Sequence, residues 1–395
     1  MKALKVLIAG GAGFIGSTIA SACVDNGITP VILDNLATGR REFTEGRTFY
    51  EGDICDGALI DRIFAEHPDI TTAVDCAALI VVPDSVANPL GYYRENVSKG
   101  IQFLEHLVRN DCRNLLFSSS ASLYRADPED FSVDENSPVD TLSPYARTKA
   151  VFETVLADVA AAGTLNVISL RYFNPIGADP QLRTGLQIRT PTHALGKMID
   201  VHHAGEAFPL TGTDYPTRDG SGLRDYVHVW DLAAAHIKAV EHFATITREA
   251  PYRVINLGTG RGTTVRELVT AFETVTGTPL PTTETPHHRD PPPPGRLRRR
   301  LCPRRPRPGP PRLEGGTLPR GRHPRLPALV REARHRPWRR GLTGEARTAG
   351  PFPSECQGGR AGGVPDPAHR SFSHRLIETP EGRGLAGRPL LGRRT

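Results

Sequence analysis

A tyrosine and a lysine four residues apart are the side chains whose types and spacing could carry chemistry. Residues 143–149 read Ser-Pro-Tyr-Ala-Arg-Thr-Lys, which places Tyr145 and Lys149 on one face of a predicted helix over 145–161. A tyrosine is a poor base near neutral pH because its reference pKa is about 10. A neighbouring ammonium group favours the phenolate and lowers that pKa, so the pair predicts a base that takes a proton from a substrate hydroxyl.

Ser120 is the third residue that could join this chemistry. It ends the strand-like run 114–120, and parallel sheets bind their ligands at the carboxyl ends of the strands. Its hydroxyl could share a hydrogen bond with a substrate oxygen. Two simpler interpretations stay open at this point, because serine clusters often cap helices and a Tyr-x-x-x-Lys spacing arises by chance.

A glycine-rich turn near the start of the chain predicts a dinucleotide site. The strand-like run 6–9 is followed by Gly10, Gly13 and Gly16, and an apolar helical pattern comes next. Gly10 supports the turn, Gly13 lets backbone N–H groups approach a diphosphate, and Gly16 lets the helix pack closely on the strand. The N–H groups and the positive dipole end of that helix would hold the anion.

The carboxylate of Asp34 strengthens this prediction. A second strand-like run, 31–33, ends in Asp34, which follows Gly16 by 18 residues. That offset is close to the roughly 20 residues at which an acid meets the adenosine ribose hydroxyls. The carboxylate would repel a 2′-phosphate and so favours NAD over NADP. Arg40 and Arg41 argue mildly in the other direction, because arginine can hold that phosphate.

The elements that must position these residues alternate between strand and helix patterns from residue 1 to about 175. This alternation predicts an α/β fold, a Rossmann-type doubly wound parallel sheet covered on both faces. Residues 175–230 are rich in Gly, Pro and Thr and are expected to be irregular. The predicted strands lie at or near 6–9, 31–34, 49–54, 72–78, 114–120, 167–174 and 254–258. The later helices are predicted at 92–109, 145–161 and 264–274. The last of these helices begins with a Thr-x-x-Glu capping box.

The composition changes sharply past Asp290. Residues 291–395 hold 24 of the 49 basic residues, all of them arginine, but only 7 of the 43 acidic ones. Two interpretations compete: a disordered basic arm that binds nucleic acid, or a segment read in the wrong frame of a GC-rich gene. We favour the second, because the core is still incomplete where the composition changes. The predicted domains are a dinucleotide-binding domain over 1–175, a smaller substrate-binding region with returning Rossmann elements over 176–290, and an irregular or disordered tail over 291–395.

Charge, cysteine usage and hydropathy exclude several classes of protein. Residues 1–290 carry the remaining 25 basic and 36 acidic residues, and an acidic body argues against nucleic acid as a partner. The six cysteines lack CxxC spacing, so neither a metal site nor a disulfide framework is expected. No apolar run approaches the roughly 20 residues that span a membrane. We therefore expect a cytoplasmic protein with no membrane partner.

Together these motifs resemble the extended short-chain dehydrogenases/reductases, and within them the UDP-glucose 4-epimerases. The resemblance covers residues 3 to about 285. It rests on GGAGFIGS, ILDNL, EGDI, FSSSASLY, SPYARTK, LRYFNPIGA, INLGTG and, most specifically, TDYPTRDGSGLRDYVHVWDLA. It implies NAD as the cofactor, a UDP-sugar as the substrate, and a homodimer that pairs through the helices over 92–109 and 145–161. It further implies that UDP-glucose and UDP-galactose are interconverted by C4 oxidation, rotation of the 4-keto sugar and re-reduction.

The resemblance also implies roles for individual residues. Ser120, Tyr145 and Lys149 form the catalytic set, and Lys149 also binds the nicotinamide ribose. Substrate contacts fall at Ser120, Tyr145, Asn174, His193 and Arg224, with Arg224 on the diphosphate as a bidentate donor. Cofactor contacts are expected at Gly10, Gly13, Phe14, Ile15, Gly16, Asp34, Asn35, Asp53, Ile54, Ala77, Ala78, Leu79, Asn96, Tyr145, Lys149 and Phe173. No metal is implied.

The chain departs from the family's pattern in three places. Ile80 stands where the family commonly has a lysine near the cofactor phosphates, and Asp75 and Cys76 replace a usual aromatic-containing pair. The match ends near residue 290, before the Arg-x-Gly-Asp stretch and the tyrosine that normally close the nucleotide pocket. Three alternatives stay open: an N-acetylhexosamine 4-epimerase, a non-catalytic NAD-binding remnant, and a nucleotide-sugar dehydratase, whose extra acid/base pair Ala121 and Ser122 do not supply.

Overall fold

Seven parallel strands form the sheet around which the chain is built. The computed structural model describes residues 4–125 and 131–286. The strands pair in the order β11-β6-β5-β4-β1-β2-β3, and every neighbouring pair is parallel. The order reverses between β1 and β4, which is where open sheets of this kind bind ligands. The expected doubly wound sheet is confirmed. Its strands are β1 (Lys5–Ala9), β2 (Thr29–Asp34), β3 (Thr48–Glu51), β4 (Thr72–Asp75), β5 (Asn114–Ser120), β6 (Asn166–Tyr172) and β11 (Tyr252–Leu257).

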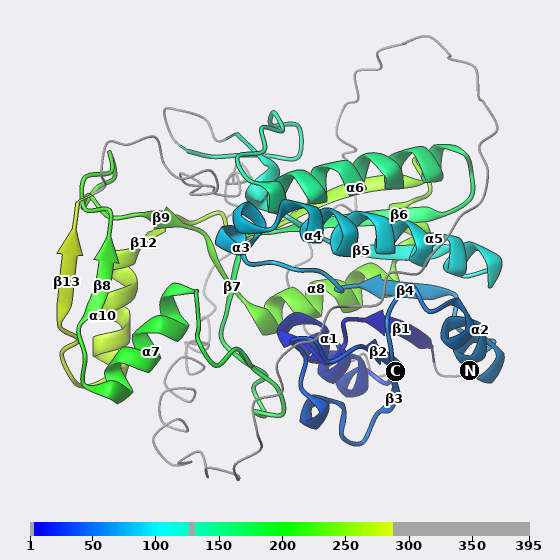
Figure 1. Ribbon diagram of the computed structural model, residues 1–395, viewed down its shortest axis with the longest axis horizontal. Helices are drawn as coiled ribbons and strands as arrows, with labels where there is room; N and C mark the ends of the chain where they lie inside the picture. The colour runs from blue at the N-terminus through cyan, green and yellow to red at the C-terminus, as the bar shows by residue number, and fades with distance from the viewer. Residues whose placement is uncertain (1–3, 126–130, 287–395) are drawn as a thin grey trace, which may run out of the picture. The chain divides into compact units, whose positions relative to one another are not determined.

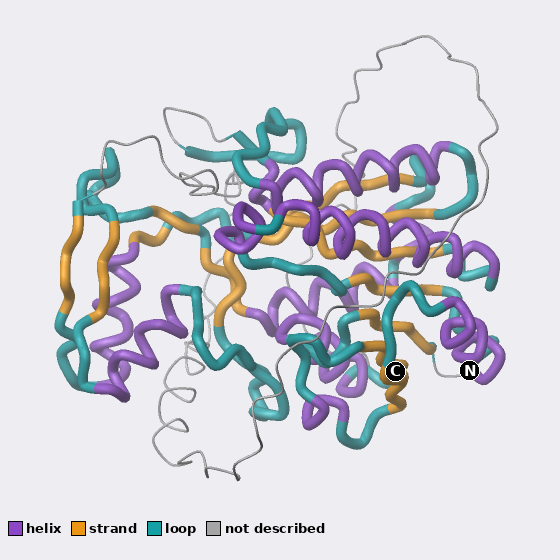
Figure 2. The backbone as a smooth tube through the Cα atoms, viewed as in Figure 1, coloured by secondary structure: helices purple, strands orange, loops and turns teal. Residues whose placement is uncertain are grey.

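Helices cover both faces of this sheet (Figures 1 and 2). One face packs on α1 (Phe14–Asp25) and α8 (Val229–Glu241), whose apolar side chains share a cluster with Ile8 of β1 and Leu116 of β5. The other face packs on α2 (Gly57–Glu66), α5 (Lys99–Arg109) and α6 (Pro144–Ala161). Because successive strand residues point to opposite faces, a strand covered on both sides must be apolar throughout, which explains the runs in β1 and β5.

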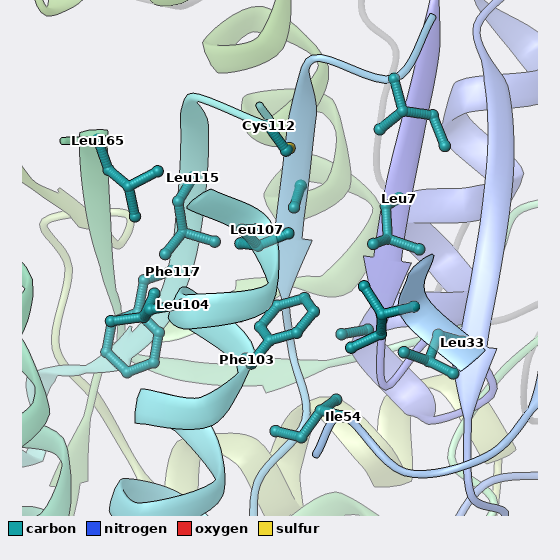
Figure 3. Packing of buried hydrophobic residues seen from close by; sticks show 14 of the residues in the cluster. Leu7, Leu33, Ile54, Phe103, Leu104, Leu107, Cys112, Leu115, Phe117 and Leu165 are labelled. Carbon is teal, nitrogen blue, oxygen red and sulfur yellow. The ribbon is translucent and has the colours of Figure 1, made fainter. Parts of the chain in front are cut away.

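The cluster beneath α5 shows how tightly this second face is filled (Figure 3). Leu7 of β1 and Leu115 of β5 are completely buried, as is Phe103 of α5. Phe117 of β5 meets Phe152 of α6 edge to face, with ring centroids 5.0 Å apart. The aromatic contact fixes α6 over the carboxyl end of β5, and thereby places Lys149, one turn before Phe152, above that strand end.

Local signals set where the important helices begin. The Ser143 hydroxyl accepts a hydrogen bond from the Ala146 N–H, and Pro144 occupies the first turn, so α6 begins one residue before Tyr145. The expected capping box of α10 (Val265–Thr276) is confirmed, because Thr264 and Glu267 each bond the other's backbone N–H. Asp56 caps α2 in the same way through the Leu59 N–H.

The helix predicted over 92–109 is interrupted. The chain forms α4 (Pro89–Tyr93), then one π-helical turn, η2 (Arg94–Ser98), and only then α5. The π turn contains Asn96, a buried side chain whose amide bonds the loop after β4. Such bulges are frequent at functional sites, since they aim a side chain that a regular helix would turn elsewhere. The spacing of apolar residues differs too little between an α-helix and a single π-helical turn for the sequence to reveal the interruption.

The prediction that 175–230 is irregular is correct for 177–193 and 212–222 but wrong for the residues between them. This stretch contains a regular helix, α7 (Ala194–Ala204), and strand β8 (Phe208–Thr211), which pairs in parallel with β13 (Thr282–Thr285). Met198 of α7 and Leu210 of β8 pack with Phe272 of α10 in an apolar cluster separate from the two sheet faces. The many Gly and Pro residues concealed this small layer. The remaining elements are η1 (Arg41–Thr44), α3 (Val82–Ala87), η3 (Ala121–Leu123), β7 (Asn174–Ile176), β9 (Leu223–Arg224), β10 (Tyr226–His228), α9 (Phe243–Ile246) and β12 (Thr263–Thr264).

The described residues lack two kinds of feature, a membrane-spanning helix and a metal-binding cluster. Within 4–125 and 131–286, no helix is both long and apolar enough to cross a membrane. The same residues contain no group of histidine, cysteine and carboxylate side chains that could hold a metal ion. The predicted tail over 291–395, with both of its interpretations, lies outside the described part of the chain.

Candidate active site

The glycine turn joins β1 to α1 at the reversal of strand order. Gly10 has a φ of +71°, and its N–H donates to the Leu33 carbonyl of β2 at 2.8 Å. A Cβ on Gly10 would lie 2.7 Å from the Cys76 carbonyl carbon after β4, and one on Gly16 would overlap the Gly10 carbonyl oxygen. Gly10 and Gly16 are therefore required by packing alone, because no side chain fits either position.

Gly13 differs from the other two glycines. It precedes α1 in an extended conformation, and a Cβ there would come no closer than 3.4 Å to any neighbour. No side chain caps α1 within the described structure, so the N–H groups of its first turn stay available to an anion. The open space at Gly13 and the uncapped turn form a cradle that fits the diphosphate of a dinucleotide.

Asp34 stands at the end of β2 beside this cradle, but its oxygens already have partners. Oδ2 accepts from the Ala12 N–H at 2.9 Å and Oδ1 from the Leu36 N–H at 2.8 Å. Burial raises the pKa of this carboxyl, and the two backbone bonds oppose the effect. A carboxylate oxygen accepts more than one hydrogen bond, so ribose hydroxyls can still be held. Arg40 donates to the Gln187 carbonyl and Arg41 pairs with Glu51, so both arginines are engaged elsewhere.

The loop after β4 forms the next part of the predicted cofactor contact. Asn96 accepts from the Leu79 N–H at 2.8 Å and donates to the Leu79 carbonyl at 2.9 Å, so the π turn fixes this loop. Asp53 is bound by the Lys99 ammonium at 2.7 Å and by the Asn35 amide at 3.1 Å. The side chains of Asn35 and Asp53 thus contact each other. The other predicted contacts in this area are Phe14 and Ile15 at the start of α1, Ile54 in the core, and Ala77 and Ala78 after β4.

Tyr145 and Ser120 meet at the carboxyl end of β5. The Ser120 hydroxyl lies close enough to the phenol of Tyr145 to affect its pKa, and it accepts from the Ser122 N–H at 3.1 Å. Ser120 therefore caps a short helical turn and also lies next to Tyr145, so its capping role and its predicted chemical role are compatible. Burial raises the pKa of Tyr145, and Ser120 opposes this rise.

The Lys149 ammonium is buried and lies below this pair. It donates to the Ser118 carbonyl at 2.7 Å and stands 4.6 Å from the centroid of the Phe117 ring. Burial lowers its pKa, and the negative charge of Asp75 raises it. The expected lowering of the Tyr145 pKa by Lys149 is not seen in this arrangement, because the ammonium is directed at β5 and β4 rather than at the phenol.

The residues predicted to hold the sugar nucleotide lie on the short strands after β6. Asn174 donates through its amide to the Asp225 carbonyl at 3.1 Å, so it lies beside Arg224, the preceding residue. Among the described residues Arg224 has no ion-pair partner, and its guanidinium donates to the Leu223 carbonyl at 2.7 Å. His193 precedes α7, and burial lowers its pKa, which favours the neutral imidazole. Phe173 is buried against Tyr124.

Several residues of this region escaped the sequence analysis. Asp225 is fully buried and accepts from the Thr259 N–H and the Gly260 N–H, both at 2.9 Å, so it holds the Gly-Thr-Gly loop next to Arg224. Gln187 reaches the glycine turn from a distant loop and donates to the Thr38 carbonyl. Ser118 supplies the carbonyl that binds Lys149. Only Ser118 carried a signal, since it belongs to the Ser-Ser-Ser run that ends β5.

Comparison with known proteins agrees with this geometry. Residues 6–258 match the model of the NAD dependent epimerase/dehydratase family. The UDP-glucose 4-epimerase of Azospirillum brasilense is 40% identical over 282 residues, which are 71% of this chain and 79% of that protein. The enzyme of the same name from Bacillus subtilis is 38% identical over 70% of this chain and 84% of its own length.

A solved structure extends the likeness to three dimensions. UDP-glucose 4-epimerase from Brucella ovis, crystallised in complex with NAD, superposes with a TM-score of 0.68 at 37% identity, covering 74% of this chain and 88% of that one. The glycine turn, the uncapped α1 and the paired Tyr145 and Ser120 lie within the matched residues. The chain belongs to the NAD dependent epimerase/dehydratase family.

Proposed function

We propose that this protein interconverts UDP-glucose and UDP-galactose by reversible oxidation at C4 of the sugar. The observation that carries the proposal is the juxtaposition of Tyr145 and Ser120 at the end of β5, on the same sheet edge as the dinucleotide cradle. Bound NAD supplies a hydride acceptor that later returns the hydride to C4. The relatives named above support this reaction rather than a dehydration.

In this mechanism the protein moves a proton and holds the sugar in place. Acting as a phenolate, Tyr145 takes the proton of the C4 hydroxyl as the hydride leaves C4, and returns the proton when the hydride comes back to the opposite face. Ser120 keeps a hydrogen bond on the same oxygen, which orients it toward the phenol. Lys149, whose ammonium lies at the Ser118 carbonyl rather than at the phenol, would bind the nicotinamide ribose of the cofactor.

Arg224 and Asn174 hold the nucleotide end of the substrate. Arg224 has the planar fork of donors that matches a diphosphate, and no carboxylate among the described residues neutralises it. Asp225 fixes the positions of both residues. Its backbone carbonyl accepts from Asn174, and its carboxylate binds the loop that follows β11. His193, kept neutral by burial, offers a donor or an acceptor to the same ligand.

The direct test is to incubate purified protein with UDP-galactose and measure UDP-glucose. Tyr145→Phe should bind NAD normally but lower kcat by roughly 10²–10⁴, the usual contribution of a positioned acid or base. Tyr50→Phe is the matched control, since it removes a hydroxyl at the surface beside Glu66. Near-normal turnover in Tyr145→Phe would refute the assignment. Formation of a 4-keto-6-deoxy sugar would indicate a dehydratase, and turnover of UDP-N-acetylgalactosamine alone would indicate an N-acetylhexosamine enzyme.

We also propose that two copies pair through the outer face of α3 to α6. Apolar side chains are exposed on this side: Val86 of α3, Leu90 of α4, Ile101 of α5 and Val151 of α6. Leu90 is the extreme case at 76% exposed. Large apolar side chains gathered on one group of helices indicate a surface that binds a partner. Sedimentation at micromolar concentration should show a dimer that Ile101→Glu disrupts, and a monomeric wild type would contradict the proposal.

A further inference from the structure

We propose that Asp75 is a positioning residue that holds the Lys149 ammonium in its charged form at the end of the sheet. Asp75 is one of the residues at which the chain departs from the pattern of the family that it resembles. The proposed function gives it no role. This inference rests on the proposed role of Lys149 and goes beyond it, because it names the group that maintains that role.

The strand register places the two groups on one face. Asp75 ends β4 and is the direct partner of Phe117 on β5, and residues paired in a parallel ladder point to the same side of the sheet. The Lys149 ammonium lies over the ring of that same Phe117 and donates to the carbonyl of the next residue, Ser118. Asp75 and Lys149 therefore flank one aromatic ring, and both are nearly inaccessible, at 3% and 4% exposed.

The other titratable groups around the pair are weaker sources of a counter-charge for Lys149 than Asp75. Glu153, one turn further along α6, is committed to Arg171 at 2.5 Å. Burial raises the pKa of Cys76 to about 12 and the pKa of Tyr172 well above its ordinary value, so both are neutral at physiological pH. In the free protein Tyr145 is also neutral at this pH, since burial raises its pKa. Among the described residues, Asp75 is the carboxylate that faces Lys149 without an arginine of its own.

The ionisation of Asp75 is consistent with this role. Burial raises its pKa to about 6, while Lys149 and the Ala77 N–H oppose the rise, so the carboxylate is charged at neutral pH and above. Burial alone would lower the pKa of Lys149, and the negative charge of Asp75 makes the largest contribution that raises this pKa again. A nearby opposite charge favours the charged form of a buried group. Without Asp75, Lys149 should lose its proton at a lower pH.

The experiment compares the alkaline side of the pH–rate profile in matched variants. Asp75→Asn should shift the alkaline fall of kcat/KM downward by about 1–2 pH units while changing the rate little at lower pH. Asp61→Asn, which removes an exposed carboxylate on α2, is the control and should leave the profile unchanged. Asp75→Ser, which is also neutral, repeats the measurement should the amide not fold.

A second readout does not depend on turnover. Calorimetric titration of the free protein with NAD should show affinity falling at a lower pH in Asp75→Asn than in wild type, because Lys149 is expected to bind the nicotinamide ribose. Superimposable pH profiles and affinities in wild type and Asp75→Asn, with Lys149→Met still inactive, would overturn the inference alone. Full activity in Lys149→Met would instead overturn the proposed role of Lys149.

Discussion

The three glycines of the turn should respond differently to the same substitution, and Gly13→Ala is the informative case. Gly13 has an extended backbone that alanine adopts freely, and its added Cβ would meet nothing closer than 3.4 Å. The free protein should therefore keep its stability or gain about 0.4–1 kcal/mol, since alanine restricts the unfolded chain. The same Cβ would fill the space in which the diphosphate is expected to lie.

Gly16→Ala supplies the opposite outcome. Its Cβ would overlap the Gly10 carbonyl oxygen, a backbone atom that cannot move without displacing the turn. Overpacking of this kind costs about 1–3 kcal/mol. Gly27→Ala separates backbone strain from crowding, because Gly27 also has a positive φ of +71° but no neighbour within 4 Å of the added atom. Its cost should be about 1–2 kcal/mol.

Thermal unfolding with and without NAD measures both effects. A ligand at 100 times its Kd stabilises a protein by about 2.7 kcal/mol, and a hundredfold loss of affinity reduces this gain to about 0.4 kcal/mol. Gly13→Ala should therefore match the wild type without NAD and fail to be stabilised by it. The reasoning is refuted if Gly13→Ala destabilises the free protein as Gly16→Ala does, or if it keeps the full stabilisation by NAD.

Three further predictions follow from buried or engaged charges. Burial lowers the pKa of His236 to about 4, so its neutral form contributes stability that is complete above about pH 6.5 and is lost as the pH falls toward 4. Between about pH 7.5 and 5 the wild type should lose roughly 2 kcal/mol of its free energy of unfolding through His236. Urea unfolding should show that His236→Gln lacks this loss, and an equal pH dependence of the free energy of unfolding in both proteins would contradict the prediction. Glu153→Gln should lower the free energy of unfolding by about 3–5 kcal/mol, because it leaves Arg171 buried and unpaired. Glu241→Gln, which removes an exposed partner of Lys238, should lower it by only about 0–1 kcal/mol in the same assay. Asp34 should make the protein bind NAD more tightly than NADP. Calorimetry should show that the ratio of the two Kd values is smaller in Asp34→Asn than in the wild type. Tighter binding of NADP than of NAD by the wild type would refute the role of Asp34.

Most of the sheet and the core of the candidate site could be predicted because their signals are local. The apolar run before Gly10 identifies β1, and the capping serine and Pro144 identify the start of α6. Once those elements form, the spacing of Tyr145 and Lys149 follows from helix geometry. The position of Ser120 follows from its place at the end of β5.

The parts that could not be predicted depend on contacts between distant residues. The direction of the Lys149 ammonium on α6 is set by the Ser118 carbonyl of β5 and, in our proposal, by Asp75 of β4. Asn96 points at Leu79 only because its helix contains a π turn. Asp225 reads as an ordinary polar loop residue, although it binds the loop at Thr259, 34 residues further along the chain.

The pairing of α1 with α8 also bears on how the chain folds during synthesis. The two helices cover the same face of the sheet, yet roughly 200 residues separate the end of α1 from the start of α8. A ribosome that adds about 5–20 residues per second needs roughly 10–40 s to make that segment. Until α8 is made, the nascent chain exposes the aliphatic residues that α8 later buries, including those of β5 and β6 once these strands have been synthesised. Native topology of such high contact order gives slow folding, so the emerging N-terminal half depends on chaperones or low local concentration to avoid aggregation.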